Sequence, residues 1–175
     1  MSTDNQFELF DVVNQKDEVV DVKPRGEVHA KGLLHRAVHG FVFNAKKQLF
    51  LQKRSMSKDS APGKWDSSFS GHVDSGETYE KACVRESFEE LGITLSAAPA
   101  CFTKIPACNE TGGEFTCLYL INHEGPFRLH PDEIDEGKWI EISDLKRELT
   151  LSPMDFASSF KKVWSSYLSK RPVIF

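Results

Sequence analysis

Three acidic residues lie within five positions of the chain, at Glu86, Glu89 and Glu90. Segment 78–91 contains neither glycine nor proline and is followed by a glycine, which predicts a helix over these residues. Positions i, i+3 and i+4 share one face of a helix, so the three carboxylates converge. Because like charges at that spacing repel, they need a cation. Carboxylate oxygens suit a hard divalent ion, Mg²⁺ or Mn²⁺.

The residues around this cluster favour a metal site over the ordinary alternative, a solvated acidic face. Glu77 stands at the helix start, where the helix dipole favours a carboxylate. Arg85 follows about two turns later, so an ion pair between the two would orient the metal ligands. Loop 71–76 has glycine at both ends, which lets backbone carbonyls approach a metal or a phosphate closely. The opposite helix face, expected to dock on the core, carries Val84, Phe88 and Leu91.

The spacing G-x5-E-x7-R-E-x-x-E-E-x-G closely resembles the signature of the Nudix hydrolases. Its fixed positions are filled by Gly71, Glu77, Arg85, Glu86, Glu89, Glu90 and Gly92. At about 5–7% usage per residue type, such a set of matches arises by chance on the order of once in a million. One position departs from the family, because Ser87 stands where an aliphatic residue is usual. We expect a modest loss of packing there and no loss of a ligand.

The resemblance implies a loop–helix–loop that binds a divalent metal and hydrolyses a nucleoside diphosphate linked to another moiety. The implied metal ligands are the Gly71 carbonyl, Glu86, Glu89 and Glu90. Glu77, Arg85 and again Glu89 are the implied catalytic residues, the first two as supports for the ligands. A diphosphate is itself anionic, so a divalent ion between carboxylates and phosphate oxygens cancels repulsion and stabilises charge in the transition state.

A second resemblance covers about residues 7–145. HRAVHGFVFNAKKQLFLQKRS and the later K-x-x-x-P-G-K-W-D-S-S-F-S-G-H resemble isopentenyl diphosphate isomerase and its hydrolase relatives. The isomerase has a catalytic cysteine where this chain has Ser70, and a hydroxyl cannot readily replace a thiol of pKa about 8.5 in proton transfer at carbon. The hydrolase signature is intact here. We therefore expect a hydrolase, with a double-bond isomerase and a non-catalytic nucleotide sensor as the alternatives.

Histidines supply a further set of candidate ligands, because the isomerase builds a histidine-rich metal site. His35, His72 and Glu114 match that site, and His29 aligns less securely. His72 is also a substrate-binding candidate, since it lies in the loop before the acidic helix. The alternative for the strand histidines His35 and His39 is an ordinary structural role.

Basic and acidic residues elsewhere supply candidates for substrate binding and proton transfer. The basic residues before the catalytic loop are Lys53, Arg54, Lys58 and Lys64. Arg54, suited to bidentate contact, and Lys64 are the candidates to hold phosphate, and the others are expected to be surface lysines. Glu133 and Glu136 are candidate general bases, with Glu133 assigned the catalytic role and a solvated acidic loop as the alternative. The candidates to stack a base are Trp65 and Phe69, for which core packing is the alternative.

The elements that must position these residues predict an α+β fold. Strands are expected in LLHRAVHGFVFN, QLFLQKR, DSSFSG, ACFTKIPA, EFTCLYLIN and KWIEI, after an N-terminal hairpin at about 7–23. A C-terminal helix is expected at about 153–169, with Ser152 as N-cap and Pro153 in its first turn. Its apolar face carries Phe156, Phe160, Val163, Trp164, Tyr167 and Leu168. We expect a single domain over 1–175, a Nudix-type α/β/α sandwich with a curved mixed sheet flanked by helices.

Bulk composition limits the cellular compartment and the kinds of binding partner that we expect for this protein. The 175 residues carry a formal net charge of −4 and no basic stripe, so nucleic acid is not an expected partner. No apolar run reaches the roughly 18–20 residues that span a bilayer, and the N-terminus does not read as a secretory signal. The four cysteines form no CxxC pair. We expect a cytoplasmic protein that acts on a small-molecule diphosphate, with a homodimer left open.

Overall fold

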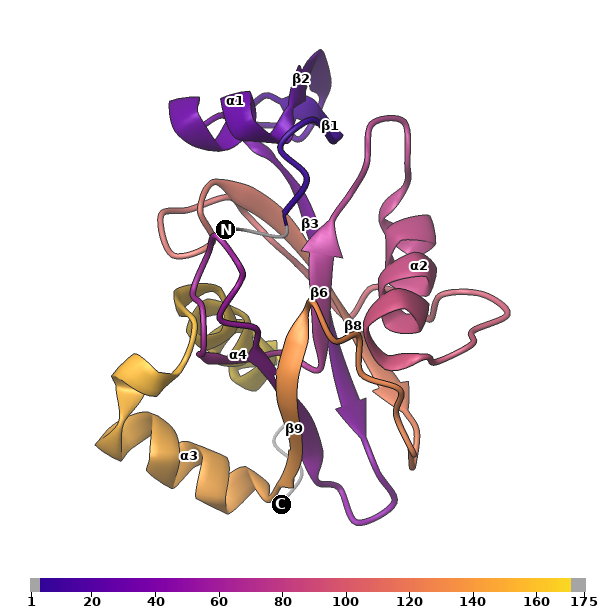
Figure 1. Ribbon diagram of the computed structural model, residues 1–175, viewed down its shortest axis with the longest axis vertical. Helices are drawn as coiled ribbons and strands as arrows, with labels where there is room; N and C mark the ends of the chain where they lie inside the picture. The colour runs from indigo at the N-terminus through magenta and orange to yellow at the C-terminus, as the bar shows by residue number, and fades with distance from the viewer. Residues whose placement is uncertain (1–3, 171–175) are drawn as a thin grey trace.

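A seven-stranded mixed sheet forms the centre of the protein, of which the computed structural model describes residues 4–170 (Figure 1). Its strands are β3 (His35–Phe43), β4 (Leu49–Arg54), β5 (Trp65–Asp66), β6 (Phe69–His72), β7 (Thr103–Ile105), β8 (Glu114–Asn122) and β9 (Ile134–Ile140). The order along the sheet is β5-β4-β3-β8-β7, with β6 also paired to β3 and β9 to β4. Strands β3 and β8 are parallel and the other pairs are antiparallel.

Helices flank the sheet, which confirms the predicted α+β class (Figure 1). They are α1 (Arg25–Lys31), α2 (Tyr79–Leu91), α3 (Ile142–Leu151) and α4 (Ser158–Lys170). The sequence alternation of β3 explains the two layers, because successive side chains of a strand point to opposite faces. Val38 and Val42 pack in the core cluster that contains Leu91 of α2, whereas Phe41 packs in the cluster that contains Trp164 of α4. None of the helices within residues 4–170 is long and apolar enough to cross a bilayer.

The N-terminal hairpin is present, formed by antiparallel strands β1 (Leu9–Val13) and β2 (Val19–Pro24). Asp17 at its tip accepts a hydrogen bond from Arg36 Nε (2.7 Å) and one from the Tyr79 hydroxyl (3.0 Å), which ties the hairpin to β3 and α2. Helix α1 follows directly and was not predicted from the sequence. Its seven residues include a glycine and are too few to show an amphipathic repeat.

The predicted last strand, KWIEI, is wrong at both ends. Strand β9 begins earlier, at Ile134, whose side chain is buried in the core. The two acidic residues that follow it in the strand face solvent. At the other end Ile142 already opens α3, an element that the sequence did not predict. Leu145 is buried in this helix. One buried side chain makes too weak an apolar stripe to predict the helix from the sequence.

The C-terminal helix begins later than predicted. Pro153 starts a single 3₁₀ turn, Pro153–Asp155, and Ser152 makes no side-chain capping bond there. Phe156 follows in extended backbone and is buried beside Trp65, so α4 begins only at Ser158. Four of the six predicted apolar positions lie on the buried face of α4: Phe160, Val163, Trp164 and Tyr167. Leu168, also predicted there, is 38% exposed.

Candidate active site

Helix α2 carries the acidic cluster and has well-formed ends. Its N-cap is Thr78, whose hydroxyl oxygen accepts a hydrogen bond from the Lys81 backbone N–H (3.3 Å). Gly92 ends the helix in the left-handed conformation (φ 71°), which glycine adopts without strain. The helix therefore occupies the segment predicted from the sequence.

The face of α2 that packs on the sheet is only partly the predicted one, because Leu91 is buried there and Phe88 is not. Phe88 is 48% exposed and lies under the guanidinium of Arg128, 5.5 Å from the ring centroid. The residues of this helix that pack against the sheet most closely, with at most 1% exposure, are Ala82, Cys83, Ser87 and Leu91. Three of these side chains are small, so the helix can approach the strands closely. The buried Ser87 hydroxyl donates to the Val84 carbonyl oxygen (3.0 Å), which leaves no unpaired donor at this position.

The three clustered carboxylates are not equivalent. Glu86 and Glu90 are buried, whereas the Glu89 side chain is about half exposed. Glu90 Oε2 accepts hydrogen bonds from Gln52 Nε2 (2.7 Å) and from the Ser70 backbone N–H (3.1 Å). Burial raises the pKa of Glu86 to about 8, against the opposing effect of neighbouring Arg85. It also raises the pKa of Glu90 well above its usual value, helped by the nearby Glu86 charge.

Gly71 provides the room for the Glu86 carboxylate. A Cβ atom at position 71 would lie 2.0 Å from Glu86 Cδ and Oε1, so any side chain there would displace the carboxylate. This glycine lies on β6, which pairs with β3 through Val38. The carboxylate therefore lies directly against the bare backbone of this strand, and the predicted approach of a backbone carbonyl to a metal or a phosphate stays a prediction.

Arg85 links the helix to the preceding loop. Its Nε and Nη2 donate to the two oxygens of Glu77 at 3.1 and 2.8 Å, so the predicted ion pair is present and bidentate. Nη2 also donates to the His72 carbonyl oxygen (2.9 Å), and Nη1 reaches Glu86 (2.5 Å) and Glu89 (3.2 Å). One guanidinium thus fixes the loop and two of the clustered carboxylates relative to one another.

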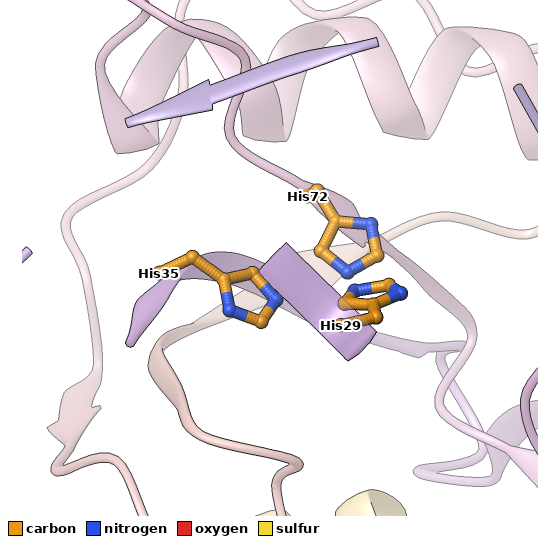
Figure 2. Close-up of side chains that lie close together, drawn as sticks. All are labelled: His29, His35 and His72. Atoms are coloured by element: carbon orange, nitrogen blue, oxygen red, sulfur yellow. The ribbon is translucent and has the colours of Figure 1, made fainter. Parts of the chain in front are cut away.

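Three histidines from separate elements form a second cluster of ligand atoms beside the carboxylates. Figure 2 shows His29 of α1, His35 of β3 and His72 of β6 with their rings turned toward one another, and one nitrogen from each lies within 4.8 Å of the others. Glu114 Oε1 lies 3.2 Å from His72 Nε2 and 3.7 Å from His35 Nε2. Both nitrogens are buried and lack a partner with hydrogen-bond geometry among the described residues.

His72 of the histidine cluster is held in the form that a metal site needs. The Phe10 ring covers it, with its centroid 4.5 Å from that of His72 and 5.7 Å from that of His35. Burial lowers the pKa of His72 to about 4, against the opposing effect of Glu114, so its imidazole is neutral at physiological pH. Nδ1 of His35 lies 2.9 Å from the Leu33 carbonyl oxygen, which orients that ring. A neutral, oriented imidazole is the form that binds metals.

The predicted substrate-binding and base residues separate into two groups. Arg54 lines the main cavity, and its guanidinium is held by the Ser60 carbonyl oxygen (2.9 Å) and Asp66 (3.5 Å). Glu133 also lines it and contacts the ammonium of Lys58 at 2.6 Å. Lys64 lies elsewhere, because its ammonium donates to a backbone carbonyl at the start of the α4 region. The other candidate residues that the structure places outside the cavity lining are His35, Lys53, Trp65, Phe69, Glu77 and Glu136.

One cavity of about 830 Å³ joins both clusters. The sequence candidates that line it are His29, Arg54, Gly71, His72, Arg85, Glu86, Glu89, Glu90, Glu114 and Glu133. Sequence reasoning missed Asp4, Arg25 and Asp66 as part of this wall, and it treated Lys58 as a surface lysine. Lys58 contacts both Asp4 and Glu133, so three distant segments meet there. No local pattern could signal that meeting, since it depends on tertiary packing.

Comparison with known proteins agrees with this geometry. The family model of the NUDIX domain matches residues 33–159. Nudix hydrolase 3 of Arabidopsis thaliana is 38% identical over 82% of this chain, although the match spans only 20% of that longer protein. An isopentenyl-diphosphate Delta-isomerase of an Enterobacter species is 29% identical and covers 83% of both proteins.

A solved structure extends the likeness to three dimensions. The crystal structure of DR0079 from Deinococcus radiodurans superposes with a TM-score of 0.74 at 31% identity, covering 83% of this chain and 90% of that one. The matched region includes the acidic helix, the glycine-bounded loop and the sheet that carries them. This chain belongs to the Nudix family.

Proposed function

We propose that this protein is a divalent-metal-dependent hydrolase that cleaves a diphosphate linkage in a small phosphorylated metabolite. The observation that carries the proposal is the pair of buried carboxylates, Glu86 and Glu90, at the wall of an open cavity. Buried charges persist when a partner compensates them. Arg85 contacts Glu86 and Glu77, and Glu90 receives neutral hydrogen-bond donors, so the pair lacks enough positive charge of its own.

The residues present fit a divalent ion of the Mg²⁺ type. Three carboxylates supply hard oxygen ligands, and Gly71 leaves the space beside Glu86 free of a side chain. Glu86, Glu89 and Glu90 would hold the ion, with the Gly71 carbonyl as a further ligand. When bound, a divalent ion supplies positive charge for the diphosphate oxygens and activates the attacking water.

The protein's own groups would prepare the reaction. Arg85 holds the ligand carboxylates and the loop carbonyl of His72 in one arrangement through its fork of hydrogen bonds. Arg54, already oriented by Ser60 and Asp66, presents a guanidinium to phosphate oxygens from the cavity wall. Glu133 is the candidate to accept a proton from the attacking water, and the Lys58 ammonium, 2.6 Å away, would hold that carboxylate in place.

The histidine cluster fits a second divalent ion. His29, His35 and His72 offer imidazole nitrogens, and Glu114 supplies a carboxylate beside them. We propose that His35→Ala lowers the amount of Mn²⁺ or Zn²⁺ bound by the purified protein by about one ion per chain. Elemental analysis after dialysis measures this, and an unchanged metal content would refute the second site.

The proposed hydrolase is tested by release of phosphate from a panel of diphosphates with Mg²⁺ or Mn²⁺. Glu90→Gln keeps the size of the side chain but removes its charge, and we expect kcat to fall at least about a hundredfold. Glu80→Gln is the matched control, because Glu80 lies in the first turn of the same helix and is exposed. Equal turnover by both variants on every cleaved substrate would refute the metal-ligand assignment.

The second candidate is a double-bond isomerase acting on an isoprenoid diphosphate. The isomerase-named relatives and the histidine cluster favour it. Ser70 speaks against it, since this cavity-lining residue offers a hydroxyl and its backbone N–H is engaged by Glu90. Incubation with isopentenyl diphosphate in deuterated water decides the matter, because deuterium in a dimethylallyl product would establish isomerisation. A nucleotide sensor would instead bind nucleotide in calorimetry and release no phosphate from any substrate.

A further inference from the structure

The wall of the main cavity is unusually polar. Among residues 4–170, its apolar lining side chains are no larger than alanine, at Ala37 and Ala61. The lining contains no phenylalanine, tyrosine, tryptophan, leucine, isoleucine, valine or methionine from the described part of the chain. Ligand sites usually present mainly hydrophobic and aromatic side chains. The composition of this wall therefore restricts what the substrate carries beside its phosphates.

The two aromatic residues that the sequence offered for stacking a base are unavailable to a ligand. The Trp65 ring is covered by the Lys138 ammonium, 4.2 Å from its centroid. Phe69 is fully buried and fills the space next to Gly40, where a Cβ would come within 1.9 Å of its ring. Neither ring lines the cavity.

The imidazoles in the wall are poor stacking platforms as well. His29 and His72 pack against each other and on Phe10, and their nitrogens face the shared ligand cluster. His39 is 3% exposed and bonds Ser67 through Nδ1 (2.7 Å). His130 lies at the rim, since it also lines a smaller hollow beside Glu89.

Uncharged hydrogen-bonding groups are present in the wall instead. Asn109, Ser158 and Ser159 line the cavity, and their side chains make no hydrogen bond with any described residue. The charged groups of the wall are largely paired, as Arg54 is with Asp66 and Lys58 with Glu133. Free amides and hydroxyls match the donors and acceptors of an alcohol.

From these observations we infer that the substrate is a hydroxyl-rich diphosphate, of the sugar or polyol type, with neither a stacked base nor an apolar chain held inside the cavity. The inference rests on the proposed diphosphohydrolase activity and deepens it. The diphosphate lies at the carboxylates, and its polyhydroxylated group meets the amide and hydroxyl side chains. A nucleobase on such a substrate projects into solvent and adds little to binding.

Three diphosphates test this inference: ribose 5-diphosphate, adenosine 5′-diphosphate and isopentenyl diphosphate. The first two differ only in the base, and stacking a base is worth about 1–3 kcal/mol, at least about fivefold in kcat/KM. We expect adenosine 5′-diphosphate to exceed ribose 5-diphosphate by less than about fivefold, and isopentenyl diphosphate to be at least about tenfold poorer than the ribose compound. A larger preference for the adenosine compound, or equal use of the isoprenoid, would overturn the inference.

Serine variants on one helix locate the hydroxyl contacts. Ser159→Ala should raise KM for ribose 5-diphosphate about fivefold, the value of one hydrogen bond. Ser165→Ala is the matched control, because Ser165 is exposed on the same helix and does not line the cavity. Equal KM values for the two variants would refute a contact at the start of α4.

Binding measurements separate the substrate class from the proposed reaction. Calorimetry with methylene-bridged, non-hydrolysable forms of the three compounds, in the presence of Mg²⁺, ranks their affinities without turnover. The same ranking in calorimetry together with no hydrolysis of any natural form would refute the hydrolase and retain the inferred class. If the natural forms are hydrolysed but the adenosine or isoprenoid form binds more tightly by the margins above, the substrate class is refuted and the hydrolase is retained.

Discussion

Replacing Gly71 by alanine separates the metal site from the stability of the fold. The added Cβ would lie 2.0 Å from the Glu86 carboxylate, a distance that real Cβ atoms do not tolerate. The atoms it meets are the far end of a flexible side chain, so the carboxylate can rotate away at modest cost. The expected variant therefore folds with a melting temperature within a few degrees of the parent, corresponding to about 1 kcal/mol or less.

The displaced carboxylate removes one proposed ligand, so metal binding should suffer far more than folding. We expect Mn²⁺ affinity to fall at least about tenfold and kcat about a hundredfold, similar to Glu86→Gln. Titration with Mn²⁺ followed by electron paramagnetic resonance measures the free ion directly. Calorimetric unfolding on the same sample gives the stability.

Gly137→Ala is the crossed control. A Cβ there would lie 2.3 Å from the Phe50 ring in the core, and its three nearest atoms all belong to that ring rather than to the acidic cluster. Overpacking of this kind costs about 1–3 kcal/mol of stability, while Mn²⁺ affinity should remain that of the parent. If Gly71→Ala bound Mn²⁺ as tightly as the parent, Gly71 would not be needed for the metal site. The same conclusion would follow if both variants lost stability and affinity in parallel.

Three other substitutions give results that the same structure predicts. Arg85→Lys keeps the charge but loses the bidentate fork to Glu77, so kcat/KM should fall about tenfold or more, as measured by steady-state kinetics; an unchanged value would exclude an orienting role. Phe10→Ala uncovers the histidine cluster and should cost about 3–5 kcal/mol in urea unfolding, whereas a cost below about 1 kcal/mol would show that the hairpin does not seal it. Asp17→Asn should cost about 1–3 kcal/mol near neutral pH, also in urea unfolding. Burial would raise the Asp17 pKa, but hydrogen bonds from Lys104 and Arg36 leave it below 3.8. The loss of unfolding free energy relative to the parent should therefore persist above that pH. It should shrink at lower pH, where acid protonates the parent carboxylate.

Strong local patterns were sufficient for the elements that carry the site. Helix α2 lies where a glycine-free and proline-free run ends at Gly92, and the expected ion pair of Glu77 with Arg85 is present although Glu77 precedes the N-cap, Thr78. The central strands follow from alternating or continuous apolar runs. These features depend on residues close in sequence, so a single sequence contains the information for them.

Features set by packing between distant segments could not be obtained in this way. Spacing places Glu86, Glu89 and Glu90 on one face, but only the position of β6 and β4 against the helix buries two of them and exposes the third. The exposure of Phe88 has the same origin, because the small residues of α2 face the sheet and turn that ring outward. Local propensity gave no means to choose between these faces.

The short helices show a different limit. Helix α1 has seven residues, and α3 buries the single side chain of Leu145. Neither helix therefore has an apolar stripe long enough to predict it from the sequence. Their contribution to the site comes through position: α1 brings His29 to the histidine cluster. A ligand from such a helix is visible only once the fold is known.

The most direct test of the central claim is a crystal structure of the protein with Mn²⁺, in which anomalous scattering identifies the ion without reference to its surroundings. We predict an anomalous peak between the carboxylates of Glu86 and Glu90, with Glu89 turned toward it, at oxygen–metal distances of about 2.0–2.3 Å. A structure at saturating Mn²⁺ that places no ion between these two buried carboxylates would contradict it.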